Sequence, residues 1–110
     1  MNVDTITLCR QIHPDQCQAI TDLGFKSLIN LRCDGECADQ PSSAELQQHA
    51  TACGLIYHHL PVDADVCLSK DAVTAFAKLV SNLPEPILVF CATGGRAKRL
   101  YQSAVVSRLI

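Results

Sequence analysis

The sequence predicts an α/β fold: a single compact domain, residues 1–110, whose central, mostly parallel sheet of about four to five strands is flanked by helices. Short apolar, β-branched runs alternate with longer segments of helical periodicity along the whole chain. Glycine or proline stands where most of these segments should end. No repeat, linker or low-complexity stretch divides the 110 residues. Strands that alternate with helices are typical of parallel β-α units.

The first strand is expected at residues 5–9, where "TITLC" is apolar and β-branched. A helix should follow from Pro14, because proline suits a first helical turn. Cys17 and Ile20 would share its buried face, and Gly24 suits the position just after its end.

The second strand is expected at residues 26–31, "KSLINL", and a polar loop around Gly35 should follow it. The next helix opens with a predicted capping box, Ser42 with Glu45, and closes on Gly54. Its apolar stripe consists of Leu46, Ala50 and Cys53.

A third strand is expected at residues 55–60, where Pro61 stops it, and Ser69 should cap the helix that follows. The continuous apolar run at residues 87–90 is typical of a strand buried on both faces. The predicted inner faces of the last two helices are Ala72, Val73, Phe76, Leu79 and Val80, then Ala97, Leu100, Tyr101, Ala104 and Val105.

Composition excludes several classes of function. The formal net charge is −2 and tryptophan is absent, so neither a basic surface nor a stacking surface for nucleic acid is expected. No run of apolar residues is long enough for a membrane helix, and the start of the chain predicts no signal peptide. The seven cysteines are an odd number, which favours free, mostly buried thiols in a reducing, cytoplasmic compartment over a disulfide framework.

The stretch "ILVFCATGGRAKRL" concentrates the chemistry of the chain. A strand, a glycine-containing turn and a helix start form an anion site, because backbone N–H groups and the helix dipole converge there. Gly94 and Gly95 allow a positive φ, and the planar guanidinium of Arg96 matches a tetrahedral oxyanion. Cys91 in that field should be a thiolate nucleophile near neutral pH. The plainer interpretation is a buried cysteine before an ordinary strand-to-helix turn.

Ligands of open α/β sheets bind beyond the carboxyl ends of the strands. Loops start there at Arg10, Arg32, Pro61 and Cys91. The topology therefore predicts that one edge of the sheet gathers, around Cys91, the side chains of Cys33, Asp34, Glu36, Cys37, Asp63, Asp65 and Cys67.

The run "GFKSLINLRCDGECADQPSSAELQQHATACGLIYHHLPV", together with "FCATGGRA", resembles the phosphatase-like domain of beta-lactamase hydrolase-like proteins, from about Gln11 to about Tyr101. The resemblance implies a protein-tyrosine or dual-specificity-phosphatase-like fold, with Cys91 as nucleophile and Arg96 as the oxyanion-binding residue. The loop amides would come from Ala92, Thr93, Gly94 and Gly95. Members of this family are described as phosphatase-like hydrolases or as sulfur transferases.

The chain departs from the patterns typical of this family and of phosphatases at four positions. Ala92 stands where Arg is usual, Ala97 where Ser or Thr is common, Phe90 where phosphatases typically have His, and Cys33 where the family often has Pro.

Three functions fit this loop. The first is hydrolysis of a phosphate ester through a cysteinyl-phosphate, with Asp65 or Asp63 as general acid. The second is rhodanese-like sulfur transfer through a Cys91 persulfide, which the four residues between Cys91 and Arg96 favour. The third is a non-catalytic module that binds anions or takes part in redox interactions.

The remaining expectations concern ligands and secondary roles. A small anionic substrate, either a phosphate ester or a sulfane-sulfur donor, is the expected partner, with no cofactor, metal, nucleic acid or membrane. The oligomeric state is left open. Arg32 is a candidate substrate contact. The thiols of Cys33, Cys37 and Cys67 are candidate resolving thiols for an oxidised or persulfidated Cys91.

Overall fold

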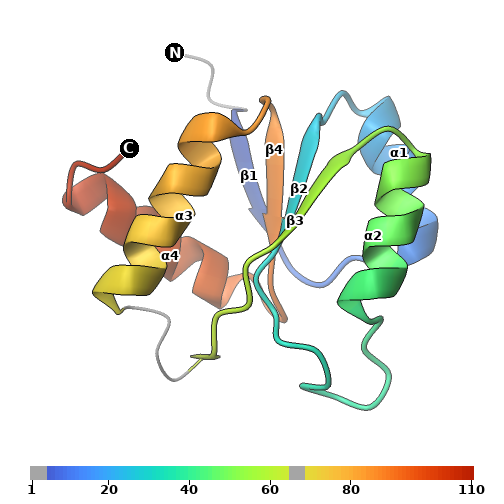
Figure 1. The fold of residues 1–110 in the computed structure, drawn as a ribbon, viewed down its shortest axis with the longest axis horizontal. Coiled ribbons are helices and arrows are strands. Elements are labelled where there is room, and N and C mark those ends of the chain that lie inside the picture. The colour runs from blue at the N-terminus through green and yellow to red at the C-terminus, as the bar shows by residue number, and fades with distance from the viewer. Residues whose placement is uncertain (1–4, 65–68) are drawn as a thin grey trace.

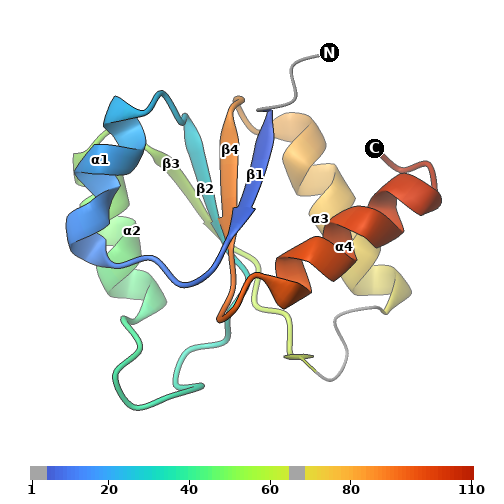
Figure 2. The same cartoon turned by 180° about the vertical axis from the view of Figure 1, so that it is seen from behind.

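The computed structural model describes residues 5–64 and 69–110. Within these residues, four parallel strands form one sheet in the order β1-β4-β2-β3, with a pair of helices on each face (Figures 1 and 2). The strands are β1 (Ile6–Cys9), β2 (Ser27–Asn30), β3 (Ile56–His59) and β4 (Ile87–Phe90). The helices are η1 (Pro14–Gln16), α1 (Cys17–Asp22), α2 (Ser43–Ala52), α3 (Lys70–Asn82) and α4 (Gly95–Val106). The predicted fold class is confirmed, and every described strand pair is parallel.

The strand order places β4 in the middle of the sheet. It pairs with β1 on one side, where Ile6 lies opposite Ile87, and with β2 on the other. All four residues of β2 and of β4 are buried, whereas β1 and β3 form the partly exposed edges. The apolar run of β4 is therefore buried on both faces as predicted, and it brings Cys91 to the centre of one end of the sheet.

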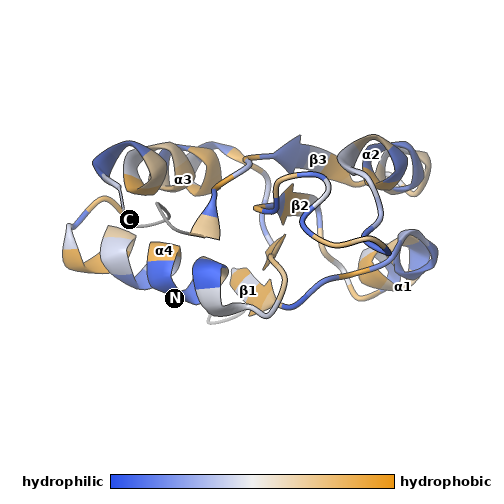
Figure 3. Ribbon diagram, turned by 90° about the horizontal axis from the view of Figure 1, so that it is seen from below, coloured by the Kyte–Doolittle hydropathy of each residue, from blue (hydrophilic) through white to orange (hydrophobic). Residues whose placement is uncertain are grey.

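Two apolar clusters hold the layers together. One lies between the sheet and the pair α3 and α4 and includes Phe76 and Leu100, while the other lies under α1 and α2 and includes Cys17 and Leu46. Seen from below, the helix pairs stand on either side of the strands, and the β3 ribbon is the hydrophilic one (Figure 3). The fold therefore has two cores that share one sheet.

Most expected helix signals are confirmed. The hydroxyl of Ser42 accepts a hydrogen bond from the backbone N–H of Glu45, which is one half of the predicted capping box, and Ser69 accepts one from Ala72. Val105 was expected on the inner face of the last helix, but it is 44% exposed because Ala97, Leu100 and Ala104 define a stripe that it lies beside. None of the described helices is long and apolar enough to span a membrane.

Candidate functional site

The segments that follow the four strands meet at one edge of the sheet, called here the carboxyl edge; Figure 3 views the molecule from that side. The backbone N–H of Gln11 donates to the carbonyl of Ala92 at 3.3 Å. Leu31 donates to Phe90 at 3.0 Å, and Val62 donates to Leu31 at 2.9 Å. These bonds confirm that the predicted loops come together around the end of β4.

The Cys91 loop, residues 91–96, turns from β4 into α4. Cys91 is 1% exposed, and the backbone N–H of Gly94 points at its Sγ at 3.1 Å. Gly94 has a φ of +92°, which only glycine adopts readily, and it is the residue that precedes the first turn of α4. Gly95 was also expected to need a positive φ, but it is the first residue of the helix and has ordinary helical backbone.

The side chain of Arg96 links three of the segments at the carboxyl edge. Its Nη1 and Nη2 donate to the two carboxylate oxygens of Glu36, both at 2.7 Å, and Nη1 also donates to the carbonyl of Val62 at 2.9 Å. The residue is only 6% exposed. The Nη1–Nη2 edge of the guanidinium is thus occupied, whereas Nε–H makes no hydrogen bond with residues 5–64 or 69–110.

Glu36 is the acceptor for four donors. Besides Arg96, the Nε of Arg32 donates to its Oε1 at 2.9 Å, and the backbone N–H of Cys33 donates to its Oε2 at 3.0 Å. The hydrogen bonds from Arg96 lower the pKa of the Glu36 carboxyl to about 2, and those from Arg32 and Cys33 act in the same direction against the opposing effect of burial. Glu36 is therefore a carboxylate at neutral pH, and it raises the pKa of Arg96 in turn.

Sequence reasoning placed Glu36 at this edge but gave it no role. Its partner Arg96 stands 60 residues further along the chain, and neither residue carries a local signal for the other. Only the Arg32–Glu36 spacing of four residues could have suggested an ion pair, and such pairs are common on surfaces.

Arg32, the predicted substrate contact, is 6% exposed and already has a partner for each guanidinium nitrogen. Nε binds Glu36, Nη1 donates to Oε1 of Gln11 at 2.7 Å, and Nη2 lies 3.7 Å from Sγ of Cys37. In this arrangement Arg32 supports Glu36. A direct contact with substrate stays a prediction.

The predicted acids and thiols differ in how they are placed. Asp63 is exposed and follows Val62, whose carbonyl accepts from Arg96, so the segment that carries Asp63 is tied to the Cys91 loop. Asp65 and Cys67 lie outside the described residues. Their proposed roles, like that of Asp63, stay predictions.

All six described cysteines are free thiols. Cys33 is partly buried, while Cys37 is exposed and its thiol donates to Oδ1 of Asp39 at 3.3 Å. Cys9, one of the thiols expected to be buried, is partly buried and lies near Cys91, whose backbone N–H donates to the Cys9 carbonyl at 3.3 Å. Burial, followed by the charge of Cys91, raises the pKa of Cys9 to about 11, so its thiol stays protonated at neutral pH.

No three His, Cys, Asp or Glu side chains of residues 5–64 and 69–110 are grouped so as to hold a metal ion.

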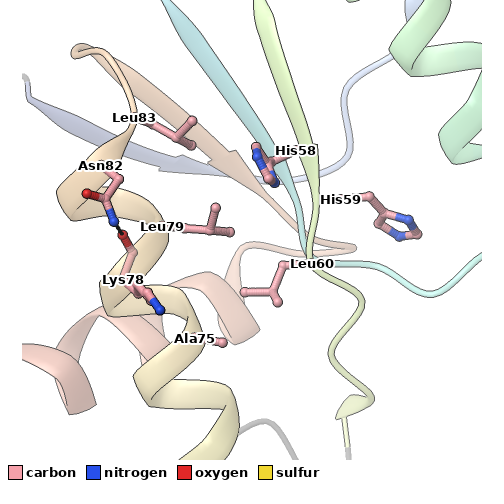
Figure 4. A pocket seen from close by; sticks show the side chains of 8 residues that line it. All are labelled: His58, His59, Leu60, Ala75, Lys78, Leu79, Asn82 and Leu83. Carbon is pink, nitrogen blue, oxygen red and sulfur yellow. Dashed lines mark hydrogen bonds between the residues drawn. The ribbon is translucent and has the colours of Figure 1, made fainter.

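A hollow between β3 and α3 is separate from the Cys91 loop. His58, Leu60, Leu79 and Leu83 are among its lining residues (Figure 4). The rings of His58 and His59 point to opposite sides of the strand, as the alternation of a strand predicts (Figure 4). The Nε2 of His59 donates to the backbone carbonyl of Arg32, so this histidine holds the start of the loop that carries Glu36 against β3.

Two solved structures of similar fold are described as "putative phosphatases". A "putative phosphatase" from Neisseria meningitidis Z2491 superposes with a TM-score of 0.83 at 29% identity, over 96% of this chain and 79% of that one. A second protein of that description, from Shewanella putrefaciens CN-32, shares the fold with a TM-score of 0.79 at 20% identity, over 98% of this chain and 68% of that one. The fold is thus that of solved structures described as "putative phosphatases".

The family can be stated more narrowly. Residues 2–107 match the model of the beta-lactamase hydrolase-like protein, phosphatase-like domain, and the chain belongs to that family. It is 37% identical over 78 residues to a beta-lactamase hydrolase-like protein of Xylella fastidiosa (strain Temecula1), and 36% identical over 78 residues to one of Agrobacterium fabrum (strain C58). Each match covers 71% of this chain but 18% of the relative, so this chain corresponds to a small part of those proteins.

Proposed function

We propose that the domain is a cysteine-dependent hydrolase of small phosphate esters, with Cys91 as the nucleophile and Arg96 as the oxyanion-binding residue. One observation carries this: the Gly94 N–H lies 3.1 Å from Cys91 Sγ in the same loop that places Arg96 in the first turn of α4. Donors aimed at a nucleophile and at its target anion are what such chemistry requires. Membership of a phosphatase-like family supports the same conclusion.

The proposed reaction has two steps. The Cys91 thiolate attacks phosphorus, the S–P bond forms, and the bond from phosphorus to the leaving oxygen breaks while a carboxylic acid protonates that oxygen. Water then attacks the cysteinyl-phosphate and gives its proton to the same carboxylate; the S–P bond breaks, and phosphate and the thiolate are released. The loop amides of residues 92–95 and the Nε edge of Arg96 would hold the phosphate oxygens.

Cys91 is almost fully enclosed, so the reacting anion has to enter the loop itself. That favours a small anionic substrate over a bulky phosphorylated surface. A thiolate nucleophile also requires a reducing compartment, which fits the six free thiols found in residues 5–64 and 69–110 and a proposed cytoplasmic location.

Sulfur transfer is the second candidate, and the four-residue spacing between Cys91 and Arg96 favours it. Here the thiolate would attack the sulfane sulfur of a donor such as thiosulfate, break its S–S bond and release sulfite. The resulting persulfide would pass that sulfur to a thiol or to cyanide and restore the thiolate. No general acid is needed.

The decisive assay compares the purified wild type with Cys91→Ser. We expect an aryl phosphate to be hydrolysed by the wild type and hydrolysis to fall at least about 10³-fold in the variant, because a serine hydroxyl is a far weaker nucleophile. Cys53→Ser, which changes a partly buried thiol at the C-terminal end of α2, serves as the matched control. Phosphate release that persists in Cys91→Ser would rule the proposal out. Thiocyanate from thiosulfate and cyanide would instead support sulfur transfer, and no turnover with either substrate would support the binding module.

The general acid is tested with Asp63→Asn and Asp65→Asn. Replacing the residue that acts as general acid should lower kcat about 10²- to 10⁴-fold for a phenyl ester, whose leaving group needs a proton. The same substitution should lower kcat much less for a p-nitrophenyl ester. The rates of both variants with the two esters provide the measurement. Equal losses on the two esters in both variants would contradict a general acid in this segment.

A further inference from the structure

We propose that Glu36 is a positioning residue: it holds the guanidinium of Arg96 by one edge so that the other edge is presented to the anion in the Cys91 loop. This rests on the proposed function, because it assigns a role within the same site. A planar guanidinium has two edges that can each make a bidentate contact, Nη1–Nη2 and Nε–Nη2. Glu36 takes the first at 2.7 Å on both oxygens, and Val62 accepts a further bond from Nη1.

The loop of residues 32–40 is built around this carboxylate. The side-chain amide of Gln40 closes it, since its Oε1 accepts from the Glu36 N–H at 3.1 Å and its Nε2 donates to the Cys33 carbonyl at 2.9 Å. Oδ1 of Asp34 accepts from the backbone N–H of Ser43 at 2.8 Å, which joins the loop to the first turn of α2. Glu36 is therefore fixed before any ligand arrives.

The charges explain why a carboxylate is needed at this position. Arg32 and Arg96 are both about nine-tenths buried, and Glu36 contacts both of them. Two enclosed guanidinium groups without a shared counter-ion would repel each other, and each would be left partly unpaired. With Glu36 in place, the trio keeps a net charge of +1, so Arg96 can still attract an anion.

The alternative for Glu36 is that its carboxylate occupies the place of the substrate anion and competes with it. The two roles predict opposite changes in anion affinity when the carboxylate is removed. If Glu36 positions Arg96, its removal weakens anion binding, whereas if Glu36 competes with the anion, its removal strengthens anion binding. The Nε edge, which makes no hydrogen bond with the described residues, favours positioning.

The test is a titration of the full chain with inorganic phosphate, followed through the backbone amide NMR signals of Gly94 and Gly95. We expect Glu36→Gln to weaken phosphate binding by about 10- to 100-fold, because an amide cannot accept from both Nη atoms and the guanidinium loses its orientation. Glu36→Asp, which keeps the charge but shortens the side chain, should lose less. The control is Asp39→Asn, which changes a carboxylate of the same loop that accepts a hydrogen bond from the Cys37 thiol.

Affinity is measured only on variants whose amide spectra show the native fold, so a purely structural role would leave the phosphate Kd unchanged. A Kd for Glu36→Gln within about twofold of the wild type, or tighter, would overturn the inference. If Glu36→Gln does not fold, an unchanged or tighter Kd for Glu36→Asp would overturn it instead. Failure of the proposed function is separate: a wild type that binds phosphate but never turns over an ester refutes hydrolysis and leaves the affinity comparison intact.

Discussion

At the scale of single residues, Arg96 decides how the candidate site is put together. Its guanidinium joins Glu36, from the loop after β2, to the Val62 carbonyl after β3, while its own backbone lies in the first turn of α4. A lysine could neutralise Glu36 as a point charge, but it has no second planar edge to offer an anion. The chemistry of the site therefore depends on this residue type and not on its charge alone.

The lowered pKa of Glu36 gives a prediction for stability against pH. The group titrates at about 2 in the folded protein against an ordinary value of 4.5, so the unfolded chain binds its proton first. The stabilisation is complete above pH 4.5 and is lost as the pH falls towards 2. Urea unfolding of the wild type, Glu36→Gln and Asp39→Asn at pH 7, 5 and 3 checks this. The wild type and Asp39→Asn should lose more stability between pH 5 and 3 than Glu36→Gln; equal losses in all three would contradict it.

At the scale of the secondary-structure elements, local signals and burial agree where the structure is regular. Ile87–Phe90 is apolar throughout and is the strand buried in the middle of the sheet. α3 begins after Ser69 and buries Val73, Phe76, Ala77 and Val80 on one face. The spacing of the apolar residues of α3 and its N-terminal cap both depend on residues that are close along the chain, which is why the sequence predicted them.

The cap of α3 gives a prediction at this scale. Ser69→Ala removes the hydroxyl that accepts from the Ala72 N–H and should lower the free energy of unfolding by about 1 kcal/mol. Ser81→Ala is the matched control, because its hydroxyl bonds the Ala77 carbonyl within the same helix and caps nothing. Denaturant unfolding measures both. A Ser69→Ala loss no larger than that of Ser81→Ala would show that the cap does not stabilise α3.

At the scale of the whole molecule, the strand order assembles the site. With β4 between β1 and β2, the loops after β1 and β2 flank the Cys91 loop, and the segment after β3 reaches it through Arg96. Helices on both faces enclose the sheet, so polar side chains and backbone amides from these loops gather at its carboxyl edge. The same fold occurs in a solved structure that is only 20% identical to this chain, since it depends on this layering and not on particular surface residues.

The sequence by itself determined the α/β class, the strands and capped helices, and the Cys91 loop, because each depends on residues that are close along the chain. It also predicted which loops would share an edge, since parallel strands leave few alternatives. The tertiary structure alone decided that Arg96 pairs with Glu36, that Arg32 supports that pair, and that Gly94 rather than Gly95 takes the left-handed backbone. Those outcomes depend on distances between segments up to 60 residues apart, which no local pattern encodes.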